Sequence, residues 1–205
     1  MTLALILSLV AGNAVAQNTS HGNDDMYGIG NSKGNEQLVN SLKARQKALR
    51  KEQQALQNKI DSALWSEALT AVQDTAFTLE ADRVVFKYGQ IAYVNSNTNF
   101  IAVDKDNAIV QVAFNIPVSG PNGIGGVTVQ GQLSGYKIET DKKGTTYIKM
   151  NVMGTGISAQ IWITMYKGTH EASVDILPNF NSQRLTLNGV ILPSAKSNVF
   201  QGRTL

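Results

Sequence analysis

The chain of 205 residues contains no cysteine and only two histidines, His21 and His170. Without cysteine it can form no disulfide framework, no thiolate metal site and no thiol nucleophile, and it cannot be acylated as a lipoprotein. The two histidines lie far apart in the sequence, so neither a zinc site nor a hydrolase triad is indicated. We therefore expect no enzyme activity, no metal site and no cofactor.

Charge is also scarce. Charged residues make up 16% of the chain, and the net charge is +3. So small a charge does not predict a nucleic-acid partner. No apolar run reaches the roughly 20 residues of a membrane-spanning helix, so we expect no transmembrane span. Hydrophobic residues, at 42%, are frequent enough to build a core.

The first sixteen residues are typical of a secretory signal peptide. Leu3 to Val10 form an apolar run, and Ala14-Val15-Ala16 supplies the small residues that signal peptidase requires. The sequence therefore predicts cleavage after Ala16 and a periplasmic or secreted protein. No Lys or Arg precedes Lys33, so the positive n-region is missing and the true translation start stays open.

Residues 17–35 are rich in Asn, Gly, Ser and Asp, which predicts a flexible linker. Residues 36–74 predict an amphipathic helix, because no Pro or Gly interrupts them before Val72. Apolar residues recur at intervals of seven, at Leu42, Leu49, Leu56 and Ala63. The residues three positions after these leucines are charged: Arg45, Glu52 and Lys59. Charges at these positions argue against a tight coiled coil.

We favour a helix whose basic face is solvated. Three other roles of residues 36–74 stay open: contact with anionic lipid or cell-wall polymer, contact with an envelope protein, and weak dimerisation.

From residue 75 to 205 the pattern changes to short alternating segments separated by Gly, Asn and Asp turns. Phe77, Leu79 and Ala81, for example, alternate with polar residues. About ten short strands with mostly tight turns predict an antiparallel barrel, because closure removes exposed strand edges. The chain thus divides into a signal peptide (1–16), a linker (17–35), a helical segment (36–74) and a β-barrel domain (75–205).

Several segments, taken in order, carry a family resemblance: FTLEADRVVFKYG, YVNSNTNFIAVDKDNAIVQVAF, GIGGVTVQGQLSGYKI, DILPNFNSQRLTLNGVILP and SNVFQG. They resemble the bacterial domain of unknown function 4251, over roughly Leu64 to Gly202. The resemblance implies an exported protein with a lipocalin-like (calycin-type) antiparallel β-barrel. It implies no established activity, cofactor or catalytic residue.

Three polar groups resemble functional sites in part. Asp104-x-Asp106-Asn107 has the oxygen donors of a calcium loop but lacks its Gly and distal Glu, so we favour a hairpin turn. Glu80 and Asp82 share one strand face, as glycosidase carboxylates can, but we favour a solvent-facing pair. The glycines from Gly123 to Gly126 precede a strand, so they do not form a phosphate loop.

The candidate ligand-binding residues lie on the rim or the interior of the predicted barrel. The Asn-rich loop beside Tyr93 could bind a sugar or could bond only to its own turn. A void inside the barrel would be lined by some of Ile101, Val110, Val112, Ile148, Met150, Trp162 and Met165, and we expect Trp162 in the core. The candidates are Tyr93, Asn97, Asn99, Met150, Trp162 and Met165.

Two functions stay open. We favour a non-catalytic binding module for a small molecule or glycan, because a barrel provides a place for a ligand. The alternative is a structural or interaction protein of the cell envelope whose barrel is filled by its own side chains. The interior of the barrel distinguishes the two.

Overall fold

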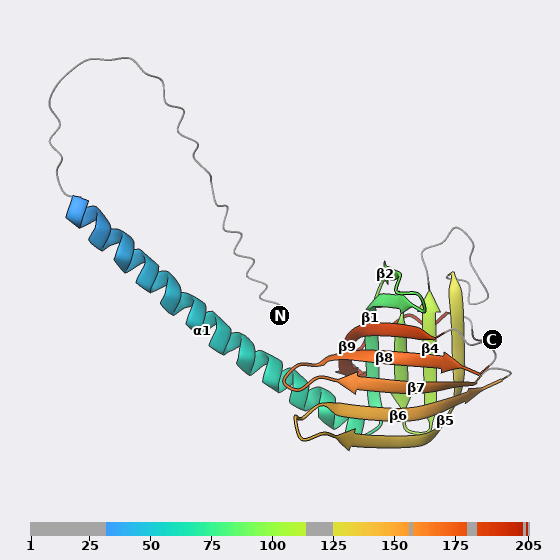
Figure 1. Cartoon of the computed structure of the whole chain (residues 1–205). Coiled ribbons are helices and arrows are strands. Elements are labelled where there is room, and N and C mark those ends of the chain that lie inside the picture. Colours follow the sequence, from blue (N-terminus) through green and yellow to red (C-terminus); the bar gives the residue numbers. More distant parts are fainter. Residues whose placement is uncertain (1–31, 114–124, 156–157, 180–183, 203, 205) are drawn as a thin grey trace, which may run out of the picture. The chain divides into compact units, whose positions relative to one another are not determined.

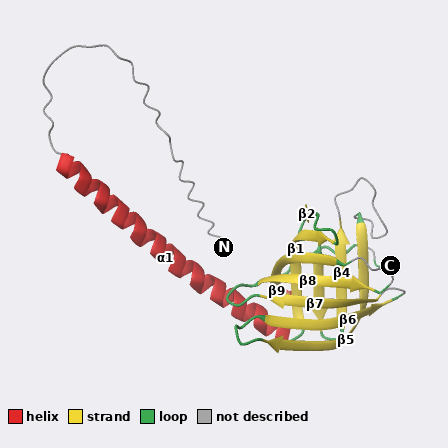
Figure 2. Cartoon of the chain, viewed as in Figure 1, coloured by secondary structure: helices red, strands yellow, loops and turns green. Residues whose placement is uncertain are grey.

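The structure, a computed structural model, describes residues 32–113, 125–155, 158–179, 184–202 and 204. The predicted signal peptide, His21 and the glycine of position 123 lie outside the described residues, as does most of the predicted linker. A single long helix, α1 (Ser32–Gln73), precedes a β domain (Figures 1 and 2). Among the described residues, those up to Lys47 belong to one unit, and those from Ala48 onward belong to another.

Nine strands and a short 3-10 helix make up the described part of the β domain. The strands are β1 (Ala76–Phe86), β2 (Ile91–Tyr93), β3 (Phe100–Asp104), β4 (Asn107–Ala113), β5 (Gly126–Thr140), β6 (Thr146–Gly154), β7 (Ser158–Met165), β8 (Glu171–Pro178) and β9 (Leu185–Pro193), and η1 is Ser194–Lys196. All neighbouring strands are antiparallel. The predicted mainly β architecture is confirmed.

The sheet closes on itself. Strands β1, β3, β4, β5, β6, β7, β8 and β9 pair in that order, and β9 pairs back with β1. The extra strand β2 pairs with β1 beyond the end of β3, on the same edge. The result is an eight-stranded antiparallel barrel with one additional strand, and the predicted antiparallel barrel is confirmed. Figure 1 shows β6 to β9 crossing over the layer that contains β1 and β4.

The described residues form nine strands and not about ten, because two glycine-containing segments are each one continuous strand. Residues 127–133 and 136–139 form the single strand β5, which bends at a register shift around Gly135 (φ 62°). The segments around Gly189 likewise form the single strand β9. Glycine marks a bend in β5 and a close approach to β1 in β9, and not the end of a strand.

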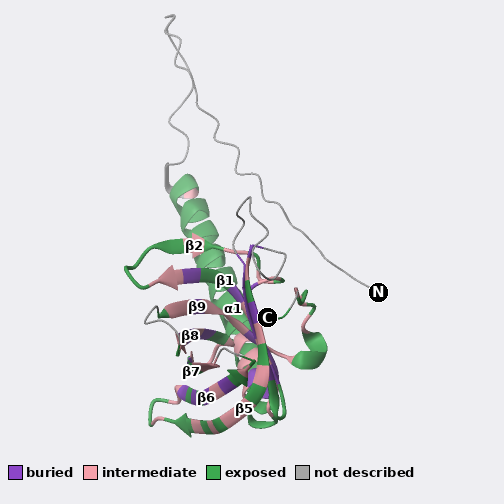
Figure 3. Ribbon diagram, turned by 90° about the vertical axis from the view of Figure 1, so that its right-hand side faces the viewer, coloured by how far each residue is buried: buried purple, intermediate pink, exposed green. Residues whose placement is uncertain are grey.

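The core is built by alternation. In β1, Phe77, Leu79 and Ala81 are fully buried, as predicted, and every second side chain is buried along β6 and along the second half of β7 (Figure 3). The last turns of α1 join this core through Ala68, Ala71 and Val72. From Asn35 to Ile60 the helix is exposed. No helix in the described ranges is both long and apolar enough to span a bilayer.

Candidate functional site

The inward positions of the barrel contact one another. Ile101, Ile148, Met150 and Met165 are at most 2% exposed, and they belong to one continuous hydrophobic cluster with Val110 and Val112. Eight strands enclose a space that side chains alone can fill. Met150 and Met165, two of the candidate ligand residues, are therefore packed among other core side chains.

Trp162 does not lie in the core, so that prediction is wrong. Its neighbours Ile161 and Ile163 are buried, and alternation turns the Trp162 ring to the outer surface of β7, where it is 38% exposed. In the sheet, Trp162 stands between Lys149 of β6 and Asp175 of β8.

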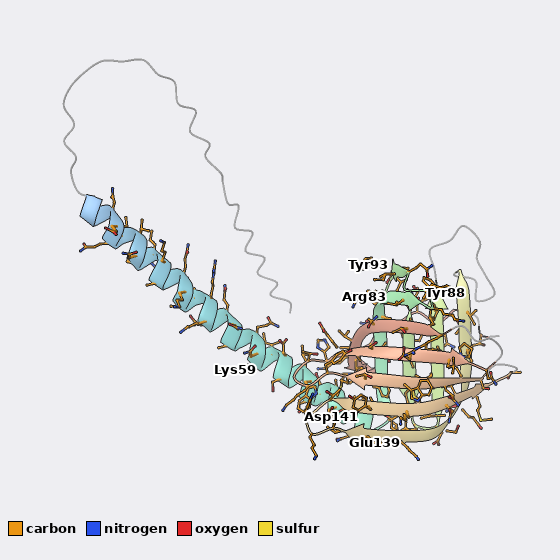
Figure 4. All side chains as sticks on the ribbon, in the orientation of Figure 1. Lys59, Arg83, Tyr88, Tyr93, Glu139 and Asp141 are labelled. Atoms are coloured by element: carbon orange, nitrogen blue, oxygen red, sulfur yellow. The ribbon has the colours of Figure 1, made fainter. Side chains whose placement is uncertain are left out.

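The Asn-rich loop lies between β2 and β3 and bonds mainly to itself. Asn99 is fully buried; its amide donates to the Asn95 carbonyl (3.0 Å) and its Oδ1 accepts from the Ala113 N–H (2.8 Å). The Asn97 carbonyl accepts from the N–H of Phe200 (2.8 Å). Tyr93, the last residue of β2, is 83% exposed and is labelled in Figure 4. The loop thus holds the C-terminal segment against the barrel.

A buried glutamine completes the attachment of this segment. Gln111 donates to the carbonyls of Thr98 (3.0 Å) and Phe200 (2.7 Å). Its Oε1 accepts from the Thr128 hydroxyl and from the Gly202 N–H, both at 2.8 Å. Every hydrogen-bonding position of the amide is therefore used within the protein, which gives Gln111 a structural role.

The other polar groups of the sequence are also accounted for structurally. Asp106 accepts through its carbonyl from the Leu133 N–H (2.7 Å) in the β3–β4 turn, and Glu80 accepts from the Ser197 hydroxyl (2.7 Å). Asp82 is exposed. Within the described ranges, no three His, Asp or Glu side chains are grouped so that they could hold a metal ion.

An open groove with two aromatic rings crosses the outer face of β5, β6 and β7. It has a volume of about 430 Å³. Tyr147 is opposite Thr164, and Lys149 is opposite Trp162, so the two rings are diagonal neighbours on this face. The groove is lined by Glu139, Tyr147, Ile148, Lys149, Trp162, Ile163 and Thr164. It therefore combines two half-exposed aromatic faces with an acidic, a basic and a hydroxyl side chain.

The β5–β6 hairpin holds one end of this groove. Asp141 Oδ1 accepts from the N–H groups of Thr145 (2.9 Å) and Lys143 (2.8 Å), and the Tyr147 hydroxyl lies 3.5 Å from Oδ2. The hydrogen bond from Thr145, together with those of the neighbouring turn, lowers the pKa of the Asp141 carboxyl. Figure 4 shows Glu139 and Asp141 at this hairpin. The carboxylate thus remains an acceptor for the Tyr147 phenol.

On the other side of Trp162 the charged groups are already paired. Arg184 donates to Asp175 through both Nε (3.0 Å) and Nη2, and the Thr186 hydroxyl donates at 2.6 Å. Burial tends to raise the pKa of the Asp175 carboxyl, but the bonds from Arg184 and Thr186 and the arginine charge lower it overall. The carboxylate that can meet a ligand in the groove is therefore Glu139.

A second, larger hollow of about 840 Å³ lies between the last turns of α1 and the β9–η1 corner. It is lined mainly by small side chains, among them Ala63, Ala71 and Ala195, and by no aromatic ring. An ion pair between Lys196 and Glu67 joins the two elements there. It therefore lacks the aromatic faces that the groove offers to a ligand.

Tyr147, Glu139 and Lys149 were not predicted from the sequence as site residues. The alternation of each strand could have identified the outward residues. Once Ile148 of β6 and Ile163 of β7 are placed inside the barrel, their neighbours in the chain, Lys149 and Trp162, face outward. The tight turn at Asp141 sets the pairing of β5 with β6. Which outward residues meet across three strands depends on the β6–β7 register, which the sequence does not specify.

Comparison with known proteins identifies the family. Residues 59–191 match the model of the domain of unknown function DUF4251. The chain is similar to the crystal structure of a DUF4251 family protein from Bacteroides eggerthii DSM 20697, with 47% identity and a TM-score of 0.62. That match covers 72% of this chain and 99% of the other. No curated protein matches the chain. The protein is therefore a member of the DUF4251 family.

Proposed function

We propose that this protein is a non-catalytic glycan-binding protein of the cell envelope, with its ligand bound in the groove on the outer barrel wall. The observation that carries the proposal is that Tyr147 and Trp162 are diagonal neighbours on that face. Glu139 is opposite Tyr147, and Lys149 is opposite Trp162. The packed inward side chains favour an outer site over one inside a lipocalin-like barrel.

The groove has the chemistry that a chain of sugar rings requires. The apolar C–H face of a pyranose can lie against the exposed faces of Tyr147 and Trp162, which are 40% and 38% exposed. The ring hydroxyls can then donate to Glu139 and accept from Lys149 and Thr164. An open groove, in contrast with a closed cavity, admits a long polymer.

Binding is tested by titrating the protein with chitotetraose and cellotetraose, two soluble pyranose chains, in a calorimeter. Trp162→Ala and Tyr147→Ala should each weaken binding of the better ligand about tenfold or more, as loss of an aromatic anchor does. Tyr88→Ala, an 82% exposed tyrosine away from the groove, is the matched control. Equal affinity of the groove variants and the wild type, or no binding of either probe, contradicts the proposal.

The envelope location rests on the sequence. An apolar run at Leu3–Val10 followed by Ala14-Val15-Ala16 supports export. Expression of the chain in a Gram-negative bacterium, followed by fractionation and N-terminal sequencing, should recover a periplasmic protein that begins at Gln17. A chain that stays in the cytoplasm with its first residues intact contradicts this part of the proposal.

A second candidate is a structural or interaction protein of the envelope. The packed interior is what this function predicted, in contrast to a ligand inside the barrel, and the exposed leucines of α1 support it too. This second function predicts that the groove variants bind both sugars as the wild type does. It also predicts that substitutions of the exposed leucines of α1 abolish binding of an envelope partner.

A further inference from the structure

Helix α1 exposes a row of large apolar side chains that glutamines interrupt. Every residue from Asn35 to Ile60 is exposed, and six of the exposed residues are apolar and large: Leu38, Val39, Leu42, Leu49, Leu56 and Ile60. An isolated helix gains little stability in water, and most helices are stabilised by packing an apolar face. In the described part of the single chain, these side chains of α1 have no apolar surface to pack against.

The spacing of this face fits a heptad repeat when the leucines are placed at the d positions. Leu42, Leu49, Leu56 and Ala63 are then d residues, and the a residues are Val39, Gln46, Gln53 and Ile60. Leucine at d with a β-branched residue at the outer a positions is typical of two-stranded coiled coils. The charged residues Arg45, Glu52 and Lys59 fall at the flanking g positions. These three charged residues would lie within the apolar seam only if the leucines were placed at the a positions, because 45, 52 and 59 would then be the d positions.

The two glutamines at a indicate the partner and its direction. In a parallel, in-register pair, Gln46 and Gln53 each face their own copies, and their amides can donate to and accept from one another. An antiparallel pair would instead set these amides against leucines. Buried polar residues at a are known to specify register in this way.

We propose that α1 pairs with the α1 of a second copy of this chain in a parallel, in-register coiled coil. Four heptads from each helix would bury on the order of 1,000 Å² of accessible surface in total, which is near the lower limit of a specific interface. The contact is therefore a modest one. Each assembly carries two barrels, so a polymer with repeated binding sites can be held at two points.

The flanking charges give this interface a distinctive salt dependence. Arg45 at g faces Arg50 at e of the second copy, while Glu52 faces the neutral Gln57. Like charges across the seam repel, and salt screens them. The dimer should therefore become tighter as salt increases. A complex of the same basic helix with an anionic surface would become weaker.

The test is sedimentation of the purified chain at concentrations up to about 100 µM, in about 50 and about 500 mM salt. We expect a monomer–dimer equilibrium that shifts toward the dimer at high salt. Leu49→Asn combined with Leu56→Asn should give a monomer with an unchanged barrel melting temperature, since both side chains are exposed in the single chain. Lys47→Asn combined with Lys51→Asn, on the b and f positions, is the control that should still dimerise.

Cysteine cross-linking tests the direction of the pair, because the chain has no cysteine of its own. Under mild oxidation, Gln53→Cys should form a disulfide-linked dimer and Lys51→Cys should not. A wild-type chain that remains monomeric in both salts overturns the proposal. Equal cross-linking of the two cysteine variants, or none at Gln53→Cys, overturns the parallel register.

Discussion

The hydroxyl of Tyr136 donates a hydrogen bond of 2.7 Å to the carbonyl oxygen of Val72, and so joins β5 to the last turn of α1. The final carbonyls of a helix lack partners within the helix, so this bond satisfies one of them. Val72 is fully buried, and Tyr136 packs against the same hydrophobic cluster. The end of the helix is therefore part of the barrel core.

Replacing Tyr136 with Phe should lower the free energy of unfolding by about 1 kcal/mol at neutral pH, because one buried hydrogen bond is lost. The Thr75 N–H also donates to the Val72 carbonyl (3.2 Å), which limits the cost. Urea denaturation measures the change. Tyr88→Phe, on an exposed tyrosine, should change nothing, and an equal effect of both substitutions contradicts the role of Tyr136.

The same tyrosine makes stability depend on alkaline pH. Burial raises the pKa of the Tyr136 phenol above its ordinary value of 10.0. The unfolded chain then loses its proton first, so the contribution is complete below pH 10 and is lost as pH rises above it. The stability difference between wild type and Tyr136→Phe should therefore shrink above that pH.

Gln111→Ala should cost about 3 kcal/mol of unfolding free energy, because it removes four hydrogen bonds made by a buried amide. Gln111→Glu should cost at least as much, since a buried carboxylate cannot donate to the carbonyls of Thr98 and Phe200. Thermal and chemical denaturation measure both. Gln130→Ala, on an exposed residue of β5, is the control, and a loss as small as the control's contradicts the structural role.

The closure of the barrel depends on a glycine. A Cβ at Gly189 in β9 would lie 1.9 Å from the carbonyl oxygen of Glu80 in β1. Gly189→Ala should therefore force the two closing strands apart and cost about 3 kcal/mol or more. Asn188→Ala, at the next position of β9, should have a much smaller effect. Hydrogen exchange at the β1 and β9 amides should rise in Gly189→Ala alone, and protected amides there contradict the account.

The pair of Asp175 and Arg184 should contribute less than about 1 kcal/mol, because the arginine is largely exposed. The pKa of Asp175 is lowered, so its contribution is present above the ordinary value of 3.8 and is lost as pH falls through the folded pKa. Asp175→Asn should be slightly less stable than wild type at pH 7, and the difference should disappear in acid. A difference that grows in acid contradicts this assignment.

The sequence predicted the barrel because alternation and turn residues are local signals. Phe77, Leu79 and Ala81 could be placed inside from their spacing alone. The same parity argument would have turned Trp162 outward, since Ile161 and Ile163 occupy the inner face. Grouping Trp162 with Met165, which has the opposite parity, was the error.

The network around Gln111 and the groove could not be predicted in the same way. Gln111 bonds to Phe200, 89 residues away in the chain, and no local pattern marks such a contact. The groove needs Glu139, Tyr147 and Trp162 from three strands at one height on the barrel wall. That height depends on the pairing register of every strand between them.

The chain's two tryptophans provide the most direct test of an outer binding site. Trp162 lies in the groove, and Trp65 packs against the core at the end of α1. In ¹⁵N-labelled protein the two indole N–H resonances can be assigned with single Trp→Phe variants and followed during titration with chitotetraose or cellotetraose. The account predicts a saturable shift of the Trp162 resonance with Trp65 unchanged. A shift of Trp65 alone would place the ligand at the barrel end and contradict the account.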